Sequence, residues 1–192
     1  MYTKTQFKKP AEWNGIMTLL AAADDNKFVE TADMKNGAYT IAAQPSCPSR
    51  VGVATTAVST ADTQGIITVV GTDQKDAVIS EVIIPVSGET VWGLLFFKTL
   101  TSITGSGWAA VAGADSIIVG TSADSLIHVG GRSIRFKALA GNIWINPKQT
   151  AVADVTSYLM VGAATEEFMI SGDLSLISDG TGATFSYMIF ED

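Results

Sequence analysis

Two runs of β-branched residues on either side of a short polar segment constrain the fold more than any other feature. Ile66–Val70 and Val78–Val86 flank the polar residues Thr72–Asp76, and a third run, Phe96–Thr104, follows directly. Val, Ile and Thr favour extended strands, and a polar turn between two such strands is typical of an antiparallel hairpin. Because similar runs continue to the end of the chain, the sequence predicts an all-β protein with no catalytic chemistry at its hairpin tips.

The other strands are predicted from short apolar or alternating runs bounded by Gly, Pro, Asn and Asp. Pro85, near the end of its run, favours an edge position or a strand end. The spacing of the runs fits a β-sandwich. The predicted strands are Arg50–Thr56, Ile66–Val70, Val78–Val86, Phe96–Thr104, Ser116–Val119, Ser133–Ala138, Ile143–Ile145, Ser157–Val161, Glu167–Ile170, Leu174–Ser178 and Thr184–Phe190.

The first 38 residues differ in character from the rest. Pro10 is suited to the first position of a short helix, in which Trp13, Ile16, Met17 and Leu20 would share one face. One interpretation is a short helix that packs on the core. The other, which we expect, is an extended arm that grips a neighbouring subunit.

The fold-class prediction is therefore two small β-sandwich or jelly-roll-like units with an N-terminal arm that contains a short helix. Its divisions are 1–38 for the arm, 39–123 for a β-sandwich domain and 124–192 for a smaller C-terminal β domain. The second boundary lies in the glycine-containing segment 120–131, where the strand runs become shorter.

Charged residues make up only 16% of the chain, against about a quarter in an average soluble domain. This favours a surface covered by partner molecules over its alternative, a monomer with a surface rich in Ser and Thr. The net charge is −7, and phosphate binding needs clustered Lys and Arg, so direct nucleic-acid binding is not expected. No apolar run approaches the roughly 20 residues that span a bilayer, and no signal peptide is evident, so no membrane partner is expected.

The residues that could carry chemistry are few. His128 is the one histidine and Cys47 the one cysteine, which is too few for a zinc site or an internal disulfide. A reducing compartment, the cytoplasm, is the expected place of synthesis. Neither a nucleophile elbow nor a nucleotide-binding glycine motif is present. We therefore expect no enzyme activity, no catalytic residues, no cofactor and no metal, and we expect Asp73 to cap its own turn.

The aromatic residues supply the interface predictions. Trp108 and Trp144 lie in strand-rich segments and are predicted to pack in the core. Phe7, Trp13, Ile16 and Trp92 lie in less regular segments and are the predicted interface residues, since buried aromatic anchors often carry binding energy.

The segments GIITVVGTD at Gly65–Asp73, ISEVI at Ile79–Ile83 and FKTLTSI at Phe97–Ile103, with their lead-in Ala43–Arg50, resemble a pattern that recurs in β-rich structural proteins of tailed bacteriophages. The resemblance covers roughly residues 40–120. The sequence departs from the pattern at Lys75 and at the bulky segment around Trp92. No catalytic residue is implied by the pattern.

The resemblance implies a virion structural protein, made in the host bacterial cytoplasm. A capsid decoration (cement) protein is the first expectation, with the major capsid protein or neighbouring virion subunits as partners and a homo-oligomeric state. A head–tail connector or tail-associated ring component is the alternative. A carbohydrate-binding or host-adhesion module is the alternative from another class.

Overall fold

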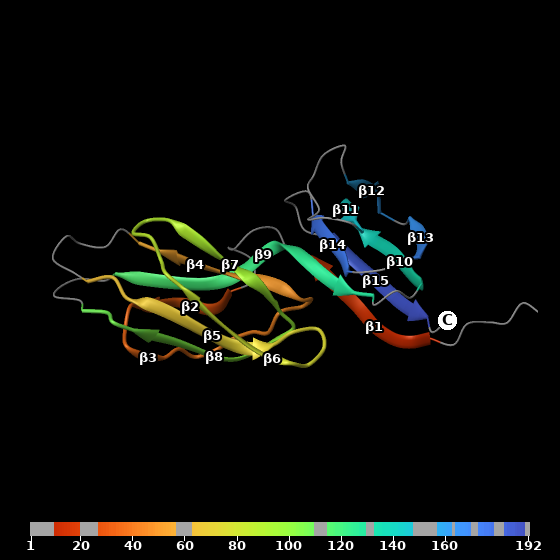
Figure 1. Cartoon of the computed structure of the whole chain (residues 1–192). Coiled ribbons are helices and arrows are strands. Elements are labelled where there is room, and N and C mark those ends of the chain that lie inside the picture. Colours follow the sequence, from red (N-terminus) through yellow and green to blue (C-terminus); the bar gives the residue numbers. More distant parts are fainter. Residues whose placement is uncertain are drawn as a thin grey trace, which may run out of the picture.

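The computed structural model of the chain is all-β, with its strands arranged in three sheets (Figure 1). The structure describes residues 10–19, 27–56, 63–109, 115–129, 133–147, 157–162, 164–169, 173–178 and 183–190. Every strand pair in the sheets is antiparallel. The prediction of an all-β fold is confirmed.

Each sheet draws on distant parts of the chain. Sheet A has the order β1 (Pro10–Leu19), β15 (Ala183–Phe190), β10 (Ser133–Ala140) and β13 (Thr165–Met169). Sheet B has the order β12 (Tyr158–Met160), β11 (Ile143–Asn146), β14 (Asp173–Ser178), β9 (Ser116–His128), β4 (Ser49–Thr55) and β7 (Thr90–Phe97), and β2 (Lys27–Asp33) also pairs with β9. Sheet C has the order β3 (Gly37–Ala38), β8 (Thr99–Ser106), β5 (Ile66–Thr72) and β6 (Val78–Ile83).

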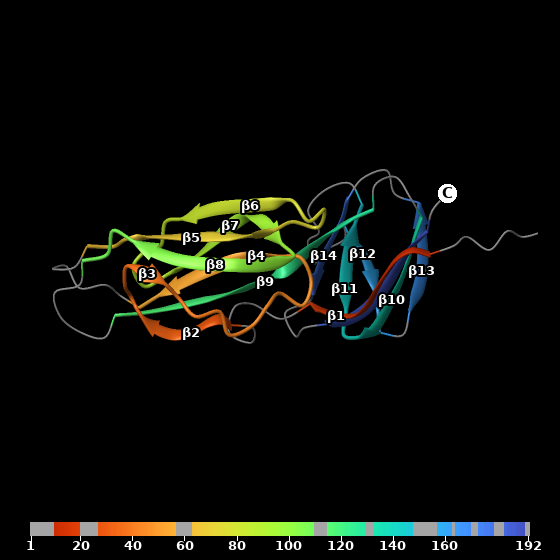
Figure 2. The same cartoon turned by 90° about the horizontal axis from the view of Figure 1, so that it is seen from below.

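Two hydrophobic cores define two lobes, which lie side by side (Figures 1 and 2). The first lobe's core lies between sheet C and the β2, β4 and β7 part of sheet B, and Phe28, Ile67 and Phe97 are fully buried in it. The second lobe's core lies between sheet A and the β11 and β14 part of sheet B. Phe136 and Phe185 stack there with ring centroids 4.8 Å apart.

Strand β9 belongs to both lobes. Its Ile117 and Val119 are in the first core and its Ile127 is in the second. The strand crosses the predicted boundary at residue 124 without a break, and Cys47, from the predicted 39–123 unit, is buried in the second core. The division into domains stays a prediction, but the two cores are not filled by two consecutive stretches of chain.

The predicted hairpin is present: β5 and β6 pair from Ile67↔Ile83 to Thr72↔Val78. The run Phe96–Thr104 is not one strand, because β7 ends at Phe97 and β8 begins at Thr99. Strand β9 continues nine residues past the predicted end at Val119, to His128.

The helix predicted to begin at Pro10 was wrong. Pro10–Leu19 is strand β1, which pairs with β15 of its own chain at the edge of sheet A. The register shifts between Trp13 and Ile16, at Asn14 and Gly15, two residues with poor helix propensity. Pairing along the edge of a sheet outweighs the weak helical spacing of the apolar residues.

Candidate functional site

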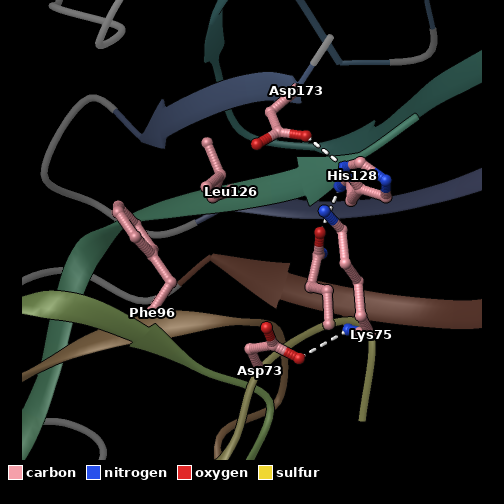
Figure 3. Close-up of a pocket in the computed structure, with 7 residues that line it drawn as sticks. Asp73, Lys75, Phe96, Leu126, His128 and Asp173 are labelled. Atoms are coloured by element: carbon pink, nitrogen blue, oxygen red, sulfur yellow. Dashed lines mark hydrogen bonds and ion pairs between the residues drawn. The ribbon is translucent and has the colours of Figure 1, made fainter. Parts of the chain in front are cut away.

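The chemistry-bearing side chains meet in a small pocket where the two lobes join (Figure 3). Its volume is about 110 Å³. The turn between β5 and β6 contributes three residues, β7 and β14 one each, and β9 two. The lining residues are Asp73, Gln74, Lys75, Phe96, Leu126, His128 and Asp173.

Strand register brings the ionisable pair of this pocket together. His128 ends β9 and Asp173 begins β14, and the two are directly opposite each other in the ladder. His128 Nδ1 forms a hydrogen bond with Asp173 Oδ1, and the backbone amide of His128 donates to the Gln74 side-chain oxygen. His128 therefore holds the first-lobe hairpin turn against the second lobe.

Asp73 organises the turn that closes the pocket. Its Oδ1 accepts hydrogen bonds from the backbone amides of Lys75 at 2.8 Å and Ala77 at 2.9 Å. The predicted capping role of Asp73 is confirmed. Because this oxygen is occupied by the turn, Asp73 acts here as a structural group.

The pocket offers an imidazole and an orienting carboxylate, but its lining residues include no hydroxyl or thiol that His128 could activate. Its volume is also below the roughly 300 Å³ at which ligand sites begin. Among the described residues no group of three or more His, Cys, Asp or Glu side chains is placed to hold a metal ion.

Exposed large hydrophobic side chains form the second candidate feature. Those of the described residues fall into two groups, one in each lobe. The larger group lies on β6, β7 and the segment between them: Val78, Val82, Ile84, Val86, Leu94 and Leu95. The smaller group lies on and beside β12, an edge strand of sheet B: Tyr158, Leu159 and Val161.

Two members of the larger group, Val78 and Val82, lie on an outer sheet face whose three paired rows carry no charge. Along β5 and β6 the side chains alternate between the core and the outer face of sheet C, so Val78 and Val82 are 78% and 54% exposed while Ile83 is buried. Three cross-strand rows of β8, β5 and β6 cover this outer face: Thr104–Thr68–Val82, Ser102–Val70–Ser80 and Thr99–Thr72–Val78. None of these side chains is charged.

An ion pair lies at one end of the face. Lys98 Nζ forms an ion pair with Asp76 Oδ1 at 2.9 Å, beside the row that ends in Val78. Next to it, the Thr72 and Thr99 hydroxyls are 2.7 Å apart in a hydrogen bond.

A bulge in β7 extends the apolar surface at the seam between sheets B and C. Arg50 pairs with Phe96 and Gly52 with Trp92, so residues 93–95 of β7 lie opposite Val51 alone. Leu94, in this bulge, is 79% exposed. Bulges re-aim side chains in this way, and here the effect is to present a leucine to solvent.

Glu81 of β6 fixes the bulge. Its Oε1 accepts the Leu94 amide at 2.6 Å and its Oε2 accepts the Leu95 amide at 3.2 Å. A Cβ at Gly93 would lie 2.4 Å from the same carboxylate, so a larger residue there would displace the Glu81 carboxylate from this position. An inward charge on an edge strand disfavours pairing with a further strand.

The structure does not bring the predicted interface residues together. Phe7 lies outside the described residues. Trp13 and Ile16 are on β1, opposite Met188 and Ser186 of β15. Trp92 is half-buried on β7 in the first lobe, with its ring over Gly52. The predicted interface role of each stays a prediction.

Two further predictions concern burial. Trp108 is in the first core, 7% exposed, as predicted, whereas Trp144 is only half-buried. Cys47 is buried, and its Sγ lies 3.5 Å from the Ser49 hydroxyl oxygen.

The uncharged outer face of sheet C was missed as a site at the level of sequence. Its signal is present in the run Val78–Val86, where Val78, Ser80 and Val82 alternate with Ile79, Glu81 and Ile83. In a strand with one solvent-exposed face the outward positions normally carry polar residues, so the exposed valines at 78 and 82 are the indication of a contact surface.

A scan against protein-family models finds no match to this chain, and no curated protein sequence is significantly similar to it. No helix among the residues that the structure describes has the length and apolar character needed to cross a membrane.

Proposed function

We propose that this chain is a non-enzymatic structural subunit of a bacteriophage virion, and that its first role is capsid decoration. The observation that carries the proposal is the presence of two separate groups of exposed hydrophobic side chains on one acidic chain, one on β6, β7 and the segment between them and one at β12. A subunit that works by assembly needs at least two contact surfaces. The resemblance to phage structural proteins favours a virion as the assembly, and it is carried by Gly65–Asp73, Ile79–Ile83 and Phe97–Ile103.

The mechanism in this proposal is mechanical. Many copies bind the capsid lattice, cover the seams between neighbouring subunits and bury apolar surface that water otherwise contacts. Burial stabilises by roughly 25 cal/mol per Å², so a modest contact repeated over a shell resists internal pressure. The partners are the major capsid protein and neighbouring copies, and the fold in this role is two small β-sandwich-like units with an N-terminal arm.

The alternative within the virion is a connector or a tail-associated ring. Two unlike apolar surfaces on one chain suit a heterologous contact, which closes into a ring when the rotation between copies permits. A carbohydrate-binding role has less support, because Trp92 places part of its ring against Gly52 and the pocket at His128 is small.

The experiment is to incubate the purified chain with empty expanded heads of the phage that encodes it, and to measure bound copies per shell after sedimentation. Saturable, stoichiometric binding supports decoration. A stable closed ring that ignores the shell moves the assignment to the connector. A chain that neither binds the shell nor forms a ring rejects the virion proposal in both forms.

The arm needs its own deletion. Removing residues 1–20 would also remove β1, an edge strand of sheet A. Deletion of residues 1–9 leaves β1 and its pairing with β15 in place. Loss of shell binding in this variant, with unchanged unfolding, supports a gripping arm, and unimpaired binding rejects it.

A further inference from the structure

We propose that Asn36 is a site of spontaneous deamidation, and that its conversion to aspartate or isoaspartate opens one end of sheet C. Asn36 and Gly37 are both exposed, and Asn36 lies directly before β3. Strand β3 has two residues and stands at the edge of sheet C, where β8 is its partner. The inference concerns the chemistry of the chain itself and does not depend on a role in a virion.

An Asn–Gly pair can modify itself without an enzyme. The backbone nitrogen of Gly37 loses its proton to a base in the solvent and attacks Cγ of Asn36, so that an N–Cγ bond forms. The Cγ–Nδ2 bond then breaks, and Nδ2 takes up a proton and leaves as ammonia. Water opens the resulting five-membered succinimide at either carbonyl and restores the chain as aspartate or isoaspartate. Glycine permits the attack because it has no Cβ to hinder it.

In the folded chain the Asn36 side chain holds Trp108. Its Nδ2 donates to the Trp108 carbonyl oxygen at 2.9 Å, and its Oδ1 accepts the Trp108 amide at 2.9 Å. Trp108 is buried in the first core, just beyond the end of β8 at Ser106. The carboxamide therefore joins the start of β3 to the end of β8, as a further rung of the ladder would.

The same contact makes the reaction slow while the chain is folded. Two hydrogen bonds hold the carboxamide at Trp108, so Cγ of Asn36 is free to turn towards the Gly37 nitrogen only when they break. The opening that this requires is local, because β3 is short, exposed and at a sheet edge. Deamidation therefore proceeds through brief openings of this end of the sheet.

The product cannot rebuild the contact. A carboxylate accepts hydrogen bonds but donates none, so it can retain the Trp108 amide but not the Trp108 carbonyl. That carbonyl loses its donor and faces a negative charge, which favours the open form. Isoaspartate also lengthens the backbone by one carbon directly before β3. Because ammonia is lost, the change is irreversible and accumulates as the protein ages.

The first test is to incubate the full-length chain at mildly alkaline pH and to map its peptides by mass spectrometry at intervals. The peptide that contains Asn36 is expected to gain one mass unit and to become a substrate for an isoaspartyl methyltransferase. In urea the conversion is expected to be at least about tenfold faster, because the two hydrogen bonds no longer hold the carboxamide. Asn36→Gln is the control: its side chain would have to close a six-membered ring, so this position is expected to stay unmodified.

Asn36→Asp reproduces one of the two products and tests the consequence. This variant is expected to unfold at a lower urea concentration than the wild-type chain, and to exchange amide hydrogens faster in the peptide that contains Trp108. Thr40→Asp is the matched control, because it adds the same charge at an exposed position close to β3. It is expected to change neither quantity.

Three outcomes overturn the inference. The first is a folded chain in which Asn36 stays unmodified while the same residue converts fully in urea. The second is equal rates of conversion in buffer and in urea, which would show that the contact with Trp108 does not hold the carboxamide. The third is an Asn36→Asp variant with the urea midpoint and the Trp108 exchange of the wild-type chain. None of these measurements involves shell binding, so failure here leaves the proposed function standing.

Discussion

Glu81 on β6 accepts a hydrogen bond from the backbone amide of Leu94 on β7, with Oε1 and N 2.6 Å apart. The two strands belong to different sheets, so this side chain joins sheet C to sheet B where no backbone ladder does. It also holds the bulge that exposes Leu94. One carboxylate thus serves both the stability of the first lobe and the shape of its apolar surface.

Replacing Glu81 with Ala should lower the free energy of unfolding by about 1–2 kcal/mol, because two amides lose their acceptor at a partly exposed site. Glu81→Gln retains one side-chain oxygen and should cost less. Urea unfolding monitored by circular dichroism measures both. Equal losses for the two variants would show that the one oxygen that Gln retains contributes nothing.

Gly52 and Trp92 should be energetically coupled. A Cβ at Gly52 would lie 2.2 Å from the Trp92 ring, so Gly52→Ala must displace the indole, at about 1–3 kcal/mol. In a Trp92→Ala background the same substitution should cost little. A double-mutant cycle by urea unfolding measures the coupling, and additive losses would contradict the close packing of this pair.

The sequence was sufficient to predict most strands from β4 onward, though not β7, because their signal is local. Alternating β-branched residues and polar turns can be recognised in a window of about ten residues. The hydrogen bonds by which Asp73 caps its turn also lie within that turn. These features need no knowledge of the rest of the chain.

The predictions that failed, or that were not made, depend on contacts between distant parts of the chain. Strand β1 exists because β15, at the other end of the chain, offers it an edge, and nothing near Pro10 encodes that partner. The role of Glu81 was missed for the same reason, since Leu94 reaches it only after the sheets pack. The pairing of His128 with Asp173 likewise depends on the register of β9 and β14.

Tyr39 should make the first lobe sensitive to alkali. Burial raises the pKa of its phenol above the ordinary value, although the Lys35 backbone amide, which donates a hydrogen bond to the phenolic oxygen, lowers it in part. The folded state therefore holds this proton more tightly than the unfolded state. Its contribution to stability is complete below about pH 10, the ordinary tyrosine pKa, and is lost as the pH rises through the higher folded value.

The measurement is urea unfolding between about pH 8 and 11, a range that brackets the ordinary tyrosine pKa. Tyr39→Phe is the control: it loses the hydrogen bond with the Lys35 amide, at about 1 kcal/mol, but should show a shallower alkaline decline. Parallel declines in the two proteins would assign the effect to other groups.

Loss of the Asp73 cap should loosen the hairpin turn and, through Gln74, its contact with His128. Asp73→Ala leaves the Lys75 and Ala77 amides without their acceptor and should cost about 1–2 kcal/mol. Asp73→Asn keeps an acceptor oxygen and should cost less. Amide hydrogen exchange at Lys75 and Ala77 checks the site directly, and unchanged exchange in Asp73→Ala would contradict the capping role.

The two lobes should unfold together. Strand β9 pairs with β4 in the first lobe and with β14 in the second, and Cys47 joins a first-lobe segment to the second core. Phe185→Leu removes part of the stack with Phe136 and should cost about 1–2 kcal/mol in the second core. Because β9 is shared, calorimetry should show one transition that moves as a whole to lower temperature. Two transitions, of which only one moves, would instead support independent domains divided near residue 124.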